Sequence, residues 1–300
     1  TERNAMATDE EKKVLAQYVG WGGLPQVFDE TNKQWQKEYF ELKSLLTAEE
    51  YEAAKGSVLN AHYTSKEVIV GIYAALARFG VKGNNRILEP ALGTGNFFGN
   101  MPQTISNGAT LYGVELDKVT GMIASKLYPQ VNVQIKGFEE TNFPNDYFDL
   151  TVSNVPFGGY GVYDSEYPRQ KFLIHDYFIA KSIDKIKPGG IVAVITSKGT
   201  LDKLNPSARK YMAERAELLG AIRLPNTAFK QTANTEAVTD ILFFQKREER
   251  ISDTSGIEWI GAGTPKWYSA RFQRRRACTV RRTLRSSRTA ETCRKRSPRQ

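Results

Sequence analysis

The stretch Ile87-Leu88-Glu89-Pro90-Ala91-Leu92-Gly93-Thr94-Gly95-Asn96-Phe97 decides the fold of this chain. A short apolar strand ends on an acidic residue, and a pair of glycines then makes a tight turn toward a helix. Glycine lets the backbone approach a ligand where a side chain would clash, and the start of a helix favours a carboxylate or phosphate. The stretch therefore predicts a strand–turn–helix unit that binds a ligand.

Strand and helix patterns alternate on both sides of this turn. The apolar strand patterns lie at 86–89, 111–116, 131–135, 147–153, 190–196, 218–224 and 238–245. Helical patterns lie between most of them, at about 118–128, 174–187 and 206–217, and a helix capped by Ser65 and ended by Gly80 precedes the first strand. This alternation predicts an α/β fold with a doubly wound, mostly parallel sheet.

The second predicted strand ends at Glu115, twenty residues after Gly95. At that distance a doubly wound fold places a carboxylate on the hydroxyls of a ribose. No Gly-Lys-Ser/Thr follows the turn, and the third glycine of the dinucleotide fingerprint is absent. The pattern therefore favours a nucleoside ligand without phosphates. The glycines alone are equally compatible with a plain turn, and the position of Glu115 favours the ligand.

A second motif, Ser153-Asn154-Val155-Pro156-Phe157-Gly158-Gly159, follows the apolar strand 148–152. The side-chain oxygen of Asn154 and the backbone carbonyl of Val155 can accept the two N–H bonds of an exocyclic amine, while Phe157 stacks on the ring. Taken alone, the stretch is read more simply as a proline-glycine loop with a core phenylalanine. The presence of the first motif favours the binding interpretation.

Together the two motifs resemble those of the S-adenosylmethionine-dependent amino-methyltransferases, most closely the adenine-specific (N6) DNA methyltransferases. In that family the pattern Asp/Asn/Ser-Pro-Pro-Phe/Tyr grips an adenine that is flipped out of the duplex. Asn154, Pro156 and Phe157 match the pattern, whereas Val155 stands where the family usually has proline. The resemblance covers about residues 60–247 and implies a Rossmann-like class I methyltransferase fold.

The resemblance also implies roles for particular residues. The expected catalytic set is Asn154, Val155, Pro156 and Phe157. The expected residues for S-adenosylmethionine are Tyr63, Thr64, Glu89, Pro90, Gly93, Gly95, Asn96, Phe97, Glu115, Phe138 and Glu139. DNA is the expected partner, and no metal ion and no membrane are expected to take part.

The flanks suggest a particular setting. Residues 18–25, Tyr-Val-Gly-Trp-Gly-Gly-Leu-Pro, resemble a segment that precedes the methylase region in very large proteins of phages, plasmids and conjugative elements. Such proteins often join the methylase to a Swi/Snf-type helicase, so the chain would be a fragment with a helicase domain of the same parent chain as a partner. The predicted organisation is a helical N-terminal extension (1–60), a methyltransferase domain (61–248), and a linker with an Arg-rich tail (249–300).

Charge is concentrated in the tail. Residues 271–300 hold eleven arginines and one lysine against one acid, which gives this segment +11 and leaves −2 for the rest of the chain. Too few large apolar side chains are present to offset the entropy of folding, so the tail is predicted to be disordered. It reads either as an abrupt change of sequence, such as a frameshift, or as a basic arm on nucleic acid. Deleting it is expected to leave the thermal midpoint nearly unchanged.

Both cysteines lie in that tail, and no apolar run is long enough to span a membrane. A cytoplasmic protein without a cysteine metal site is therefore expected.

Two alternatives to DNA adenine methylation stay open. Protein-glutamine and RNA methyltransferases use similar loops, and Val155 also fits an inactive cofactor-binding module that serves a helicase. If the loop is built as in the family, Val155→Pro is expected to keep or raise activity. Beyond the motif, Tyr160, Tyr163 and Tyr167 lie in a loop that begins with Gly158, Gly159 and Gly161, and this aromatic loop either stacks on bases or packs internally.

Overall fold

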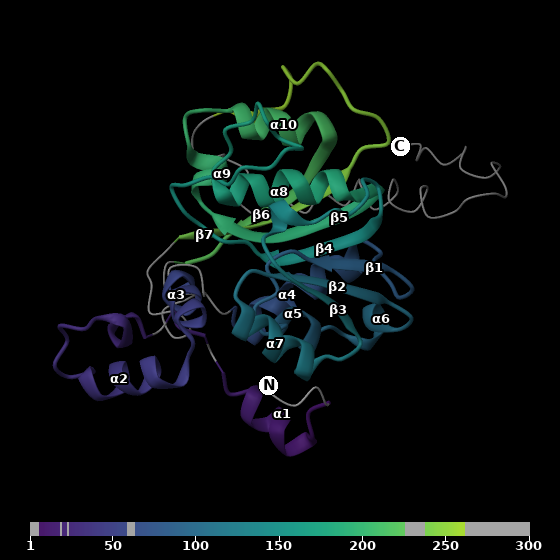
Figure 1. The fold of residues 1–300 in the computed structure, drawn as a ribbon. Helices are drawn as coiled ribbons and strands as arrows, with labels where there is room; N and C mark the ends of the chain where they lie inside the picture. The colour runs from purple at the N-terminus through teal and green to yellow at the C-terminus, as the bar shows by residue number, and fades with distance from the viewer. Residues whose placement is uncertain (1–5, 19, 23, 59–63, 226–237, 262–300) are drawn as a thin grey trace, which may run out of the picture.

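The computed structural model describes residues 6–18, 20–22, 24–58, 64–225 and 238–261 (Figure 1). One seven-stranded sheet forms its centre, with the order β3-β2-β1-β4-β5-β7-β6. The strands are β1 (Arg86–Glu89), β2 (Thr110–Glu115), β3 (Val131–Ile135), β4 (Phe148–Asn154), β5 (Ile186–Ser197), β6 (Ala216–Arg223) and β7 (Thr239–Lys246). β1 to β5 pair in parallel, and β7 runs antiparallel between β5 and β6. The predicted doubly wound, mostly parallel sheet is confirmed.

Helices cover both faces of the sheet (Figure 1). One face carries α4 (Lys66–Arg78), α5 (Asn96–Gly99), α6 (Gln103–Ser106) and α7 (Lys118–Leu127), and the other carries α8 (Ile174–Lys185), α9 (Gly199–Asp202) and α10 (Ser207–Arg215). Successive side chains of β5 point to alternate faces of the sheet. Val192 and Val194 pack in the core under α8, whereas Ala193 packs in the core under α4. Because a strand alternates its side chains between faces, one continuous apolar run supplies both cores.

The helix α4 shows how the sequence sets these elements. Its buried residues Ile69, Ile72 and Leu76 recur at helical spacing and face the sheet. Ser65 stands at the N-cap position, and Gly80 takes a φ of 91° just after the helix ends. Both ends of the helix agree with the prediction. Glycine suits the position after the last turn, because the backbone there takes a left-handed conformation.

The N-terminal extension is helical, as predicted. It contains α1 (Asp9–Leu15), the 3-10 turn η1 (Pro25–Phe28), α2 (Gln36–Leu45) and α3 (Ala48–Ser57). Capping boxes begin α1 and α3, at Thr8 with Glu11 and at Thr47 with Glu50. The extension has a small core of its own around Phe28, Tyr39 and Tyr51, and it reaches the domain through contacts of α1 and α3 with α7.

The predicted boundary at residue 248 needs correction. Residues 249–261 are not a free linker, because the short turn η3 (Glu258–Ile260) packs on the domain. Trp259 and Ile260 are buried in the core under α8, and the Trp259 ring lies 5.8 Å from that of Phe244. The fully buried Arg209 side chain donates a hydrogen bond of 2.9 Å to the Ile260 carbonyl. This segment is therefore held in place by the buried side chains of Trp259 and Ile260 and by the hydrogen bond from Arg209.

The Arg-rich segment 271–300 lies outside the described residues, so its predicted disorder stays a prediction. Within the described residues, no helix combines the length and the apolar character that crossing a membrane requires. The cytoplasmic setting likewise stays a prediction.

Candidate functional site

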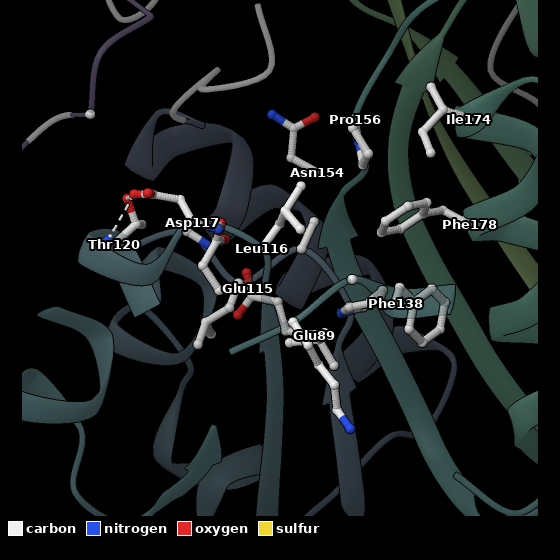
Figure 2. Close-up of a pocket in the computed structure, with 18 of the residues that line it drawn as sticks. Glu89, Glu115, Leu116, Asp117, Thr120, Phe138, Asn154, Pro156, Ile174 and Phe178 are labelled. Carbon is white, nitrogen blue, oxygen red and sulfur yellow. Dashed lines mark hydrogen bonds between the residues drawn. The ribbon is translucent and has the colours of Figure 1, made fainter. Parts of the chain in front are cut away.

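A pocket of about 520 Å³ lies at the carboxyl ends of β1, β2 and β4, whose last residues Glu89, Glu115 and Asn154 all line it (Figure 2). The strand order reverses between β1 and β4. Doubly wound sheets bind their ligands at this reversal, because the connections there leave toward opposite faces and open a crevice. The volume suits a small organic ligand.

The pocket brings together most of the predicted site residues. Those that line it are Thr64, Glu89, Pro90, Gly93, Asn96, Phe97, Glu115, Phe138, Glu139, Asn154 and Pro156. Gly95, Val155 and Phe157 are not among the lining residues, and Tyr63 lies outside the described residues. Two motifs separated by about sixty residues of chain therefore meet in one cavity, while the individual roles stay predictions.

Gly93 and Gly95, the two glycines of the first motif, are required for different structural reasons. Gly93 has a φ of 55° and faces open space, since a Cβ there would meet no atom within 4 Å. Gly95 has a φ of 85°, and a Cβ there would lie 2.7 Å from the Tyr128 ring. Gly95 thus makes room for a tyrosine of α7's end rather than for a ligand. The helix after the turn is only α5, four residues long, so the expected anion site at its start is not built.

Glu115 is held in a fixed orientation by the backbone. Its Oε2 accepts a hydrogen bond from the Gly93 N–H at 2.8 Å, and its Oε1 accepts one from the Asp117 N–H at 2.9 Å. Each oxygen keeps a second lone pair for a ligand. Burial raises the pKa of the Glu115 carboxyl to about 7, the charge of Asp117 adds to this, and the two backbone hydrogen bonds oppose it.

Glu89 is a second carboxyl in the same pocket, and it is 1% exposed. Burial raises its pKa well above the ordinary value, and the charge of Glu115 raises it further. Within the described part of the chain, its Oε2 accepts no hydrogen bond. Buried polar atoms are rarely left in this state, so a ligand that donates hydrogen bonds or carries positive charge suits this end of the pocket.

An apolar wall stands beside the two carboxyls. Phe138 and Phe178 line it, with ring centroids 5.2 Å apart and ring planes tilted by 43°. Leu116, Val114 and Ala91 add aliphatic surface. Flat apolar surface next to hydrogen-bond acceptors is the pattern of a site for a heterocycle joined to a hydroxylated group.

Asn154 and Pro156 lie at the other end of the pocket from Glu89 and Glu115 (Figure 2). Asn154 pairs with Ile195 of β5 in the sheet, so its backbone is held by two neighbouring strands. Phe157 is partly buried and packs against the core under α4. In this structure Phe157 therefore occupies a packing position, and its expected stacking on a base stays a prediction.

Val155 is anchored more firmly than its motif suggests. Its side chain is 1% exposed within the core, and its N–H donates a hydrogen bond of 3.1 Å to the Ile195 carbonyl. Proline has no N–H to donate, so the structure argues against the expectation that Val155→Pro is harmless.

We expect Val155→Pro to destabilise the fold by about 1–3 kcal/mol, because the buried Ile195 carbonyl loses its donor. Urea unfolding of Val155→Pro beside the wild type measures this, and Val155→Ala, which keeps the N–H but removes two buried carbons, shows what a cavity alone costs at this position. A proline variant as stable as the wild type would show that this hydrogen bond contributes nothing.

Several residues that line the pocket were not predicted from the sequence. Asp117 caps α7: its Oδ2 accepts hydrogen bonds from the backbone N–H of Thr120, at 2.9 Å, and from the Thr120 hydroxyl. An aspartate just before a helical pattern is a signal that could have found it. Gly20 and Gly56 come from the extension, and the Tyr18 hydroxyl lies 3.4 Å from Thr120 Oγ1. No local pattern indicates that the extension forms a wall of this pocket.

Among the residues that the structure describes, no three or more histidine, cysteine or acidic side chains are grouped so that they could hold a metal ion.

Comparison with known proteins identifies the family. The family model of the N-6 DNA methylases matches residues 45–275. The chain belongs to the N-6 DNA methylase family. This N-6 DNA methylase is also similar to individual proteins. It is 30% identical over 281 residues to the defense against restriction protein B of Escherichia phage P1, a match that covers 88% of this chain and 11% of the phage protein. The chain thus spans about a tenth of the length of that relative.

Solved structures show the fold of this N-6 DNA methylase. A Listeria monocytogenes protein assigned to the class I S-adenosylmethionine-dependent methyltransferases aligns with a TM-score of 0.53 and 17% identity, over 86% of this chain and 88% of that one. The M protein of the type I restriction enzyme EcoKI aligns with a TM-score of 0.51 and 16% identity, over 82% and 57%. The predicted class I methyltransferase fold and the predicted family are confirmed.

Proposed function

We propose that the chain transfers a methyl group from S-adenosylmethionine to the exocyclic amine of adenine in DNA. The observation that carries this proposal is the single pocket that joins Glu115, at the end of β2, to Asn154, at the end of β4. One end of the pocket suits a nucleoside, and the other offers an amide to an amine. The family match supports DNA adenine as the acceptor.

The residues present fit S-adenosylmethionine. The oriented carboxylate of Glu115 would accept hydrogen bonds from the ribose hydroxyls, and Phe138 and Leu116 would flank the adenine ring. Glu89, whose buried Oε2 has no donor within the described part of the chain, would meet positive charge or N–H groups. When bound, this cofactor supplies a methyl group on a positively charged sulfur.

The acceptor end would work by positioning. Methyl transfer to an exocyclic amine needs the nitrogen lone pair to point along the line of attack. The Asn154 side-chain oxygen would accept an N–H of the amine and turn its lone pair toward the methyl group. Pro156, which lines the same end, stiffens the chain next to Asn154.

Parallel transfer assays test the proposal. The purified chain is incubated with S-adenosylmethionine and, separately, unmethylated genomic DNA, RNA and protein extract, and the products are digested and analysed by mass spectrometry. N6-methyladenine from DNA is the expected product. Methylated RNA or methylglutamine would move the acceptor to one of the alternative classes. Cofactor binding without any transfer would favour the cofactor-binding module.

The length of the phage P1 relative supports the expectation that the chain is part of a larger protein. A helicase domain in the same parent chain stays an expectation.

A further inference from the structure

We propose that residues 156–173, between β4 and α8, form a nucleic-acid contact in which Tyr163 stacks on a base next to the target adenine. This segment, the target loop, begins at Pro156 in the pocket and ends at α8. The inference rests on the proposed function, because it assigns the surface that would hold the DNA.

The target loop is anchored from below by α8. Asp164, 4% exposed, accepts hydrogen bonds from Lys181 Nζ at 2.7 Å and from the Tyr177 hydroxyl at 2.6 Å. Two residues on, Glu166 pairs with Lys185 Nζ at 2.7 Å. Both lysines are almost completely buried. Removing one partner of such a buried pair is costly, so these contacts fix the path of the loop.

The same contacts pair the acidic residues of the loop and leave its basic residues exposed. Its two acids, Asp164 and Glu166, are neutralised by lysines of α8. Arg169 and Lys171 are exposed, and neither makes an ion pair within the described part of the chain. The outward charge of the target loop is therefore positive, although the chain outside its tail is close to neutral. A positive outer surface next to the acceptor end of the pocket suits a phosphate backbone.

Tyr163 is the most exposed aromatic residue of the target loop, at 81%. It directly precedes the anchored Asp164 and lies three residues after Tyr160, which lines the pocket. The loop folds back on itself here, since the Ile174 N–H donates a hydrogen bond of 2.7 Å to the Tyr160 carbonyl. The Tyr163 ring is therefore presented from a fixed backbone without being packed. A contact that is ordered before binding loses less entropy when its partner arrives.

An adenine that leaves the duplex exposes the faces of its neighbouring bases. Every base offers a flat face, so an aromatic ring beside the pocket can stack there without reading the sequence. Arg169 and Lys171 would hold the adjoining phosphates. Positive charge and a free ring together favour nucleic acid over a protein acceptor.

Kinetics on unmethylated genomic duplex DNA test the stacking. Tyr163→Ala and Tyr163→Leu are expected to lower kcat/KM for DNA by about 5- to 150-fold, whereas Tyr163→Phe, which keeps a flat ring, stays near wild type. S-adenosylmethionine affinity and the urea midpoint are expected to be unchanged in all three, because the ring is exposed. Phe40→Ala is the matched control, since Phe40 is an exposed aromatic on α2, away from the pocket lining.

Salt dependence tests the phosphate contacts. Binding of a fluorescein-labelled DNA duplex of random sequence is measured by anisotropy over a range of salt concentrations. Arg169→Ala and Lys171→Ala are each expected to reduce the slope of log Kd against log salt by about 0.9, the value for one lost phosphate contact. An unchanged slope in both variants would overturn the phosphate part of the inference.

The outcomes separate the inference from the function. If Tyr163→Leu matches Tyr163→Phe, or if Tyr163→Ala changes nothing or also weakens cofactor binding, the stacking role is overturned. If the wild-type chain binds the duplex but methylates no DNA, the proposed function fails. The stacking role is then judged by whether Tyr163→Ala weakens duplex binding and Tyr163→Phe does not. If the wild-type chain neither binds nor methylates DNA, both proposals fail.

Discussion

Asn154→Ala is expected to lower the turnover of methyl transfer by about 10²- to 10³-fold, the range seen when one hydrogen bond to a developing charge is removed. The amide oxygen of Asn154 would bind the amine more strongly as its nitrogen becomes tetrahedral and its N–H groups become more acidic. Its loss therefore acts on the transition state, and S-adenosylmethionine affinity should stay near wild type. Single-turnover kinetics and calorimetry measure the two quantities separately.

Asn154→Asp is the matched control for that prediction. Aspartate keeps an oxygen acceptor of the same length and occurs at this position in the pattern that the motif resembles. It is expected to retain more activity than alanine. An alanine variant that is folded and fully active on every acceptor would remove Asn154 from the reaction and favour the cofactor-binding module.

S-adenosylmethionine affinity is expected to rise with pH and to level off above the pKa of about 7 that burial gives the Glu115 carboxyl. Only the ionised carboxylate can accept hydrogen bonds from both ribose hydroxyls on both oxygens. At one pH unit below that pKa most of the free protein carries protonated Glu115, so affinity should be about tenfold lower at pH 6 than its limiting value. Isothermal titration calorimetry from pH 6 to pH 8 measures this.

The free energy of unfolding of the protein without cofactor should fall as pH rises, whereas cofactor affinity rises. In the unfolded chain Glu115 ionises near the ordinary value of 4.5, and in the folded chain near 7. Between these values the folded state holds the extra proton, so stability falls as pH rises from about 4.5 to about 7.

Glu115→Gln is expected to flatten this contribution to both profiles. It leaves Glu89, Asp117 and Glu139, the other acids that line the pocket, in place. A glutamine variant with the same pH dependence of cofactor affinity would show that Glu115 is not the group whose titration controls binding.

The sequence predicted the elements of the fold because local patterns specify them. β1 and β3 begin and end where the apolar runs do. β5 begins at Ile186, four residues before the predicted start, because Lys187-Pro188-Gly189 reads as a turn. The pairing does shift register there, from Phe148 with Ile186 to Leu150 with Ile191. The turn signal therefore marked an irregularity within the strand instead of its start.

The site was predictable where one motif holds both the residue and its position. Glu89, Glu115 and Asn154 each end a strand, and the carboxyl ends of parallel strands meet at one edge. Phe178 and Gly20 line the same pocket from α8 and from the extension, and only tertiary packing brings them there. Val155 shows the limit of a motif, because its partner is the Ile195 carbonyl on a different strand.

The central position of β4 sets the order in which parts of the site open. β4 lies between β1 and β5, and its residues Leu150, Thr151 and Val152 are completely buried, whereas β3 forms an edge of the sheet. Amide protons of such a strand exchange with solvent mainly through global unfolding, while an edge strand opens locally at lower cost. Below the urea midpoint, deuterium should therefore enter β3 well before β4. The backbone that carries Asn154 would stay protected until the whole domain unfolds, so gentle denaturation should loosen the outer edge of the sheet while the acceptor end keeps its geometry.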